Sequence, residues 1–403
     1  MAATKGVCFP QGFLSSGIRS GIRKNRLKLD LALVTSQTRA AAAAVYTTNK
    51  VKGAPILVTQ EHLADGYAQA IIVNSGIANT CTADGHAIAG AMCALVEQHA
   101  GIPQGDVIVA STGVIGEPLP IMPIATGMPD LVVGLKADSL NAAHAIMTTD
   151  TYKKEAGVTF TLGGKECRIG GMAKGSGMIH PNMATMLAFL TCDAAAEPSV
   201  LQAMLKEAAD DTFNLLSVDG DTSTNDMLCI LSNGMAGNPP VTDAESPDGK
   251  VLQGALKEIC RQLCKLLAAD GEGASHLLEC NVHGAATVAD ARKLARSVVS
   301  SNLTKAAFYG ADANWGRILC AMGYSGADFN PAKVEVVLRS EAGSVIVCEN
   351  GAGVGLDEDF AKRVLTEKAI HIDITCGDGA ADATAYGCDL TYEYVKINGD
   401  YRT

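Results

Sequence analysis

Short apolar runs and longer amphipathic segments alternate along this chain, with glycine-rich and polar stretches between them. Runs of about five apolar residues predict buried strands, and apolar residues at helical spacing predict helices. Strands or strand-containing regions are predicted at 29–34, 40–60, 70–74, 107–110, 226–232, 371–375 and 389–397. Helices are predicted at 85–99, 141–149, 197–210, 250–269, 291–300 and 360–367, and hairpins at 158–169 and 333–348. The mixture predicts an α/β fold that ends in a disordered tail from Asn398.

The segment 170–193 changes character in its middle. Its first half holds four glycines, Lys174, His180 and Pro181. This composition opposes a regular element, because glycine loosens the backbone and proline lacks an N–H donor. Residues 185–191 are apolar or hydroxylated without a charge, which predicts a buried strand. A polar loop therefore leads into a buried strand, and the small-residue step Ala184-Thr185 marks the junction.

The Ala184–Thr185 bond suggests a nucleophile made by self-cleavage. A threonine hydroxyl is a poor nucleophile without a base, and the α-amine freed by cutting this bond would ordinarily have a pKa of about 7.7–8.0. Thr185 could make the cut by attacking the preceding carbonyl, which the small Ala184 leaves accessible. An ordinary loop-to-strand connection explains the same residues, and the loop composition alone favours that interpretation.

Composition and charge limit the class of protein. The 403 residues suffice for two or more domains or for one multi-layer domain, and 48% of them are hydrophobic. The formal net charge of −11 argues against a nucleic-acid or anionic-membrane surface. No run approaches the roughly 18 to 20 apolar residues of a membrane span, and the first residues lack the apolar stretch of a signal peptide. A cytoplasmic location is expected.

Metal and nucleotide motifs are not predicted. The 13 cysteines are scattered without a C-x-x-C pair, which favours reduced core thiols. The acidic segment that begins at Asp219 has Thr224 and Ile230 where a calcium loop needs glycine and glutamate. The glycines of 351–355 lack the register of a dinucleotide-binding motif.

Residues 174–194 have the sequence KGSGMIHPNMATMLAFLTCDA. This segment closely resembles the self-cleavage segment of the ornithine acetyltransferases, also called glutamate N-acetyltransferases. The resemblance runs from the first tens of residues to the last one. It implies the stacked α/β/β/α fold of the DmpA class of self-processing aminopeptidases. It also implies an α chain of residues 1–184 and a β chain of residues 185–403, in α2β2 or larger assemblies.

The same resemblance assigns site residues. Thr185 matches the acyl-carrying nucleophile, and Thr112 and Gly113 match the pair that stabilises the oxyanion. The residues that match substrate contacts are Thr148, Lys174, Thr185, Glu272, Asn398 and Thr403. By their types alone, Lys174 is equally well a surface lysine, and Glu272, between two glycines, an exposed turn residue at a helix end.

The resemblance implies a two-step transfer of acetyl from N-acetylornithine to glutamate through acetyl-Thr185, without a cofactor. Some members of the family also accept acetyl-CoA, and no motif here decides this. A hydrolase on the same scaffold, an aminopeptidase or amidase, is the alternative, and an uncleaved binding protein is the third. His180 is expected to shape the loop beside Pro181, and Trp315, the only tryptophan, to pack in a core or at a subunit contact.

Overall fold

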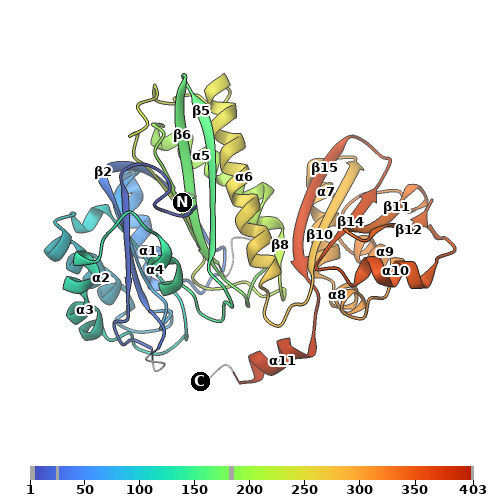
Figure 1. The fold of residues 1–403 in the computed structure, drawn as a ribbon, viewed down its shortest axis with the longest axis horizontal. Helices are drawn as coiled ribbons and strands as arrows, with labels where there is room; N and C mark the ends of the chain where they lie inside the picture. Colours follow the sequence, from blue (N-terminus) through green and yellow to red (C-terminus); the bar gives the residue numbers. More distant parts are fainter. Residues whose placement is uncertain (1–4, 24–26, 181–185, 401–403) are drawn as a thin grey trace. The chain divides into compact units, whose positions relative to one another are not determined.

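The computed structural model describes residues 5–23, 27–180 and 186–400, which fold into two compact units (Figure 1). Unit 1 comprises Met1–Gly175, Asn182–Asp210 and Thr222–Leu263, and unit 2 comprises Ser176–Pro181, Asp211–Asp221 and Cys264–Thr403. This partition concerns packing. The expected division into chains 1–184 and 185–403 concerns one peptide bond outside the described residues and stays a prediction. Within the described ranges, no helix has the length and apolar character needed to cross a membrane.

Unit 1 is built on an eight-stranded sheet in the order β4-β3-β2-β9-β7-β6-β5, with β1 also paired to β2. Its strands are β1 (Phe13–Ile18), β2 (Leu31–Tyr46), β3 (Tyr67–Asn74), β4 (Val107–Ser111), β5 (Lys154–Leu162), β6 (Lys165–Lys174), β7 (Leu187–Cys192) and β9 (Met227–Ser232). β3 and β4 are parallel, as are β7 and β9, and the other pairs are antiparallel. The predicted strand 185–191 and the predicted hairpin 158–169 are therefore present, each with shifted ends.

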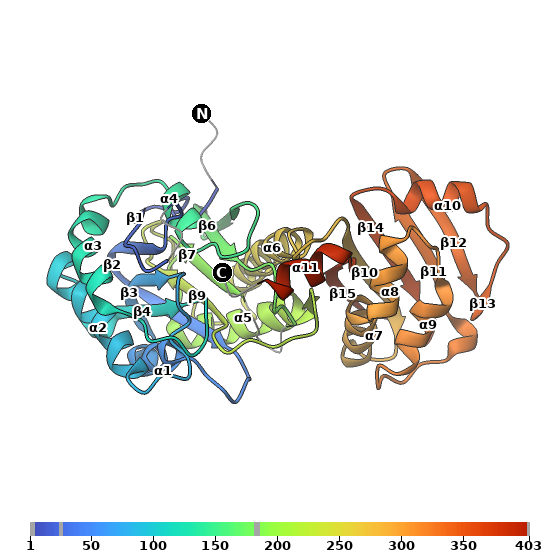
Figure 2. The same ribbon diagram turned by 90° about the horizontal axis from the view of Figure 1, so that it is seen from below.

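Both faces of this sheet are buried, which explains why its strands read as continuous apolar runs. Alternate residues of β2 point to opposite faces. Leu31 and Leu33 pack with α2 (Gly85–Ala100) and α3 (Ile121–Val133), whereas Ala32 and Val34 pack with α4 (Leu140–Ala145). Figure 2 shows α2 and α3 side by side, on the face of the sheet to which Leu31 and Leu33 point.

Two further helices cover the other half of the unit 1 sheet, α5 (Pro198–Asp211) and the larger part of α6 (Pro247–Ala269). A Cβ at Gly171 of β6 would lie 2.7 Å from the Leu190 side chain and 3.2 Å from that of Leu263. Glycine at this position therefore lets α6 approach the sheet closely.

Unit 2 contains a seven-stranded sheet in the order β13-β12-β11-β14-β10-β15-β8. Its strands are β8 (Leu216–Ser217), β10 (Leu277–Ala285), β11 (Glu335–Ser340), β12 (Gly343–Glu349), β13 (Ala352–Gly353), β14 (Ala369–Thr375) and β15 (Ala381–Cys388). Its helices are α7 (Val288–Ser300), α8 (Asn302–Tyr309), α9 (Trp315–Gly323), α10 (Glu358–Leu365) and α11 (Tyr392–Gly399).

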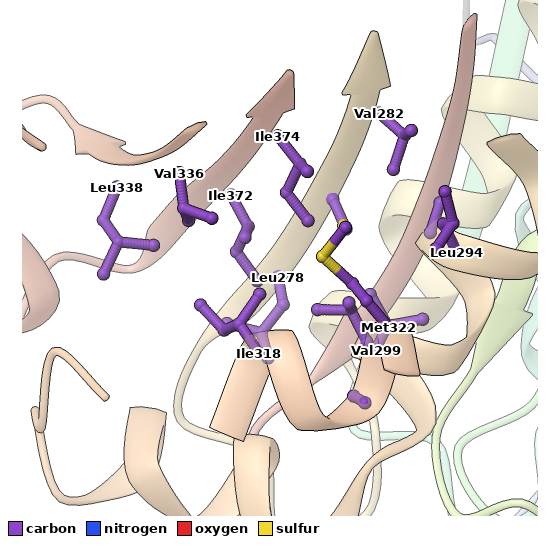
Figure 3. Packing of buried hydrophobic residues seen from close by; sticks show 14 of the residues in the cluster. Leu278, Val282, Leu294, Val299, Ile318, Met322, Val336, Leu338, Ile372 and Ile374 are labelled. Atoms are coloured by element: carbon purple, nitrogen blue, oxygen red, sulfur yellow. The ribbon is translucent and has the colours of Figure 1, made fainter. Parts of the chain in front are cut away.

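The core of unit 2 lies between this sheet and its helices (Figure 3). Alternate residues of β14, such as Ile372 and Ile374, meet side chains of α7 and α9, among them Leu294 and Met322. Trp315 packs against the same cluster. It is half-buried at the edge of this core, and the alternative of a subunit contact is not tested.

The α/β fold class, with two sheets packed among helices, is confirmed. The predicted strand region 40–60 holds the end of β2 but is wrong from residue 54 onward, and the predicted strand 389–397 is wrong. Residues 54–62 form α1 (Ala54–His62), because Pro55 stands in the first turn, where its missing N–H leaves no hydrogen bond unmade. Residues 389–397 do not continue a strand: β15 ends at Cys388, Thr391 takes the N-cap position, and α11 follows. In so short a segment, alternation of apolar and polar residues does not distinguish an exposed helix from a strand.

Candidate active site

The two residues predicted to stabilise an oxyanion lie directly after β4. The N–H of Thr112 donates to the Asn74 carbonyl at 3.0 Å, so this amide is already used. Gly113 has φ +127, and a Cβ there would lie 2.3 Å from the Gly76 carbonyl oxygen, so the turn requires glycine. Among the described residues the Gly113 N–H has no hydrogen-bond partner. The Thr112 hydroxyl and the Gly113 amide therefore remain available to a ligand.

Lys174 ends β6 and is only 3% exposed, so it is a buried lysine rather than a surface one. Its Nζ lies 3.4 Å from the Thr112 Oγ1. Burial lowers the pKa of Lys174, while the charges of Asp150 and Asp226 act in the opposite direction. In the ladder between β6 and β7, Lys174 stands opposite Leu187, two residues after Thr185 in the sequence.

Asp150 joins the segments that hold Thr148 and Lys174. One carboxylate oxygen accepts the N–H of Thr148 at 2.8 Å, and the other accepts the N–H of Gly175 at 2.7 Å. Its Oδ1 also lies 2.5 Å from the Nζ of Lys154, and both side chains of this ion pair are fully buried. Burial by itself raises the pKa of Asp150, but the charges of Lys154 and Lys174 and the bond from Gly175 bring it to about 2. The sequence analysis missed this residue: Asp150 lies in the loop after α4 and Lys154 begins β5, so their spacing of four gave no helical signal.

Thr148 lies in the loop after α4, which ends at Ala145 and is shorter than the predicted helix 141–149. Its carbonyl lies 3.3 Å from the Nζ of Lys28, and the Arg23 guanidinium donates to the carbonyl of Met147. The loop is thus held by Asp150 on its amide side and by basic residues on its carbonyl side.

Asp226 is a second buried acid that the sequence analysis missed. It is 1% exposed and directly precedes β9. Its Oδ2 has no hydrogen-bond partner among the described residues. Burial raises its pKa well above the usual range, and a bond from the Met186 N–H and the charge of Lys174 lower it in part. Met186 follows Thr185 in the sequence, and its carbonyl accepts the N–H of Met227 at 3.2 Å.

Glu272 lies in unit 2, in the turn after α6, and it is 8% exposed rather than open to solvent as predicted. Its N–H donates to the Ser176 carbonyl at 2.8 Å, and its Oε2 accepts the Asn398 side-chain amide at 2.8 Å. Asn398 belongs to α11 and not to a disordered end. The two side chains form one polar pair, which the sequence spacing of more than a hundred residues could not reveal.

The remaining predicted positions give mixed outcomes. Ala184, Thr185 and Thr403 lie outside the described residues. The Nδ1 of His180 lies 3.0 Å from the Ser217 Oγ, and burial lowers the pKa of His180 to about 4. This contact fits a role in shaping the loop. Among the described residues, no group of three or more His, Cys, Asp or Glu side chains is placed to hold a metal ion.

Comparisons with known proteins identify the family of this chain. The ArgJ family model matches residues 14–403. The arginine biosynthesis bifunctional protein ArgJ of Caldanaerobacter subterraneus subsp. tengcongensis is 48% identical over 396 residues, which cover 98% of each chain. A crystal structure of arginine biosynthesis bifunctional protein ArgJ from Bacillus halodurans is 40% identical, covering 52% of this chain and 96% of that one, with a TM-score of 0.49. A structure of ornithine acetyltransferase complexed with ornithine from Mycobacterium tuberculosis is 36% identical, covering 45% and 96%, with a TM-score of 0.40.

Proposed function

This chain is an acyltransferase of the ArgJ family, and we propose that it transfers acetyl from N2-acetyl-L-ornithine to L-glutamate through an acetyl ester on Thr185. The observation that carries the proposal is the arrangement after β4. Among the described residues the Gly113 N–H has no hydrogen-bond partner, and the hydroxyl of the preceding Thr112 lies 3.4 Å from the Nζ of the buried Lys174. Acyl transfer passes through a tetrahedral oxyanion that needs such fixed donors.

In the first step of the proposed reaction, the α-amine of Thr185 takes the proton of its own hydroxyl. The hydroxyl oxygen then attacks the acetyl carbonyl of N-acetylornithine. The Thr112 hydroxyl and the Gly113 N–H donate to the oxyanion. Lys174 can donate to the Thr112 oxygen, which leaves the Thr112 hydrogen to point at the oxyanion. The carbon–nitrogen bond breaks, the proton passes to the leaving amine, and ornithine departs.

In the second step, the uncharged α-amine of glutamate attacks the acetyl ester. The proton lost from this amine returns to the Thr185 oxygen as the ester bond breaks, so N-acetylglutamate forms and the free enzyme is regenerated. The chain's own groups supply nucleophile, base and oxyanion donors, so these steps need no cofactor.

Self-cleavage at Ala184–Thr185 is part of the proposal, since it frees the α-amine that serves as base. The sheet of unit 1 supports it, because strands from both sides of this bond are paired within that sheet. β6 pairs with β7, and β2 pairs with β9. The backbone ladders would therefore hold an α chain and a β chain together after the cut. We further propose assembly into α2β2 or a larger complex.

The double-reciprocal plots of initial rates should be parallel. A covalent acetyl-enzyme releases ornithine before glutamate reacts, so varying N-acetylornithine at several fixed glutamate concentrations gives lines of equal slope. Intersecting lines would contradict the covalent intermediate. Acetate released at the full rate without glutamate would instead identify a hydrolase.

The substitution Glu272→Gln should raise the KM for N-acetylornithine about tenfold, with little change in kcat. The proposal pairs the Glu272 carboxylate with the side-chain ammonium of ornithine, and a hydrogen bond between charged groups contributes about 1.5–3 kcal/mol. The backbone bond from Glu272 to Ser176 survives the change, and glutamine still accepts from Asn398. Glu335→Gln, at an exposed position of β11, is the matched control. An unchanged KM in Glu272→Gln would remove Glu272 from the substrate site.

A further inference from the structure

Asp219 is a highly connected acid of unit 2 that the proposed reaction leaves without a role. It lies after β8 and begins the acidic segment that does not fit a calcium loop. Its carboxylate accepts the N–H of Met178 at 2.5 Å, that of Ile179 at 2.8 Å and that of Asp221 at 3.2 Å. In addition, the Val218 N–H donates to the Ile179 carbonyl at 2.6 Å. The turn at Asp219 therefore fixes the backbone at 178–179, six residues before Ala184 and Thr185.

This backbone is held in an uncommon conformation next to Glu272. Met178 has φ +54, which is unfavourable for a residue with a side chain, and Asp219 accepts the amides of both Met178 and Ile179. A Cβ at Gly177 would lie 2.1 Å from the Glu272 Oε2. The loop thus runs directly against the Glu272 carboxylate, and its position decides the space around that group.

Asp219 also contacts the helix that carries Asn398. The phenol of Tyr394 in α11 donates to the Asp219 Oδ2 at 3.2 Å. One helical turn later, the Asn398 amide donates to the Tyr394 carbonyl at 3.0 Å and to the Glu272 Oε2 at 2.8 Å. The helix is anchored at its start too, because the Thr391 hydroxyl donates to the Gly273 carbonyl at 2.7 Å.

We propose that Asp219 is a positioning residue for the ammonium end of the substrate: through Tyr394 it sets the orientation of Asn398 and Glu272, and through its contacts with Met178 and Ile179 it sets the loop against them. The inference rests on the proposed function, because it assigns Glu272 to the ornithine ammonium. Burial, and after it the charge of Asp219, raises the pKa of Tyr394, which keeps the phenol protonated as the donor. Neither Asp219 nor Tyr394 needs to touch the substrate.

The substitution Tyr394→Phe tests the link to the helix, because it removes one hydroxyl and leaves the ring and backbone in place. It should raise the KM for N-acetylornithine about fivefold, the equivalent of one ordinary hydrogen bond, with kcat within twofold of the wild type. Tyr392→Phe removes the same group from an exposed position in the same helix, where the side chain is 82% exposed, and should change neither constant. If the Tyr394 hydroxyl only stabilised the fold, Tyr394→Phe would lower the midpoint of thermal unfolding without changing KM.

The substitution Asp219→Asn gives a second readout. It should raise the same KM about tenfold and slow self-cleavage, seen as residual uncut chain by intact mass. Adding Tyr394→Phe to the Asp219→Asn variant should raise its KM by no more than a further twofold. Both substitutions break the same contact, the one between Tyr394 and Asp219.

The outcomes distinguish the positioning role of Asp219 from the proposed function. The wild-type chain can transfer acetyl while Tyr394→Phe and Asp219→Asn both keep the wild-type KM. That result overturns the positioning role alone. Multiplicative effects in the double variant overturn it as well. A wild-type chain that transfers no acetyl from N-acetylornithine to glutamate overturns the proposed function and, with it, this role.

Discussion

The Thr185→Ala variant should remain one uncut chain of 403 residues and 41.6 kDa and should lose acetyl transfer by a factor of about a thousand or more. The wild type should separate under denaturing conditions into fragments of 184 and 403 − 184 = 219 residues. The substitution removes the hydroxyl proposed to cut the chain and to carry the acetyl group. An alanine in its place can do neither.

Two control variants sharpen this result. Thr185→Ser keeps a hydroxyl and should still yield both fragments, with reduced transfer. Thr161→Ala changes an exposed threonine of β5 and should behave as the wild type. Intact mass and a coupled assay for ornithine release measure the two effects independently. A Thr185→Ala chain that is cut and active would overturn both roles of Thr185.

The Lys154→Met variant should have the largest effect on stability, a loss of about 3 kcal/mol in the free energy of unfolding. The ammonium of Lys154 lies 2.5 Å from the carboxylate of Asp150, and both side chains are fully buried. Removing one partner leaves a buried carboxylate without its nearest counter-charge, which costs about 3–5 kcal/mol in proteins. Because Lys174 also acts on Asp150, we expect the lower end of this range.

The midpoint of urea denaturation should therefore fall by about 1 M or more. Lys165→Met changes an exposed lysine on the same hairpin and should alter the free energy of unfolding by no more than about 0.5 kcal/mol. The double variant Lys154→Met with Asp150→Asn removes both buried charges and keeps an acceptor for one of the two backbone amides. It should recover part of the loss. Equal midpoints for Lys154→Met and Lys165→Met would show that the buried pair contributes nothing.

The effect of Lys154→Met should also depend on pH. The pKa of Asp150 is about 2 in the folded chain and about 3.9 for an unfolded aspartate. A carboxyl group with a lowered folded pKa contributes stability above its unfolded pKa and loses that contribution as the pH falls through the folded value. The difference between wild type and Lys154→Met should shrink as the pH is lowered from about 4 to about 2.

The positions of the main elements could be predicted because local pattern determines them. The runs 70–74 and 107–110 lie in strands, 226–232 does so from Met227 onward, and 85–99 and 250–269 lie in helices. The errors at 54–62 and 389–397 came from short segments in which both periods fit. At 54–62 the proline in the first turn favours a helix, and at 389–397 the strand ends at Cys388 before α11 begins.

Burial of charge could not be predicted from the sequence. Lys174 in a glycine-rich stretch and Glu272 between glycines both had the local pattern of surface residues, yet they are 3% and 8% exposed. A buried charge is tolerable only where partners satisfy it, and those partners come from distant segments. Glu272 accepts a hydrogen bond from Asn398, and the negative charges of Asp150 and Asp226 act on Lys174.

By itself, the sequence determined the α/β class, because periodicity is a local property, and its segment 174–194 carried the resemblance that predicts a nucleophile at Thr185. The tertiary structure alone placed the Thr112 hydroxyl beside Lys174, left the Gly113 amide without a partner among the described residues, buried the Asp150–Lys154 pair and anchored α11 to Asp219. Each of these depends on a distance or a degree of burial, and strand pairing and packing across the fold set both.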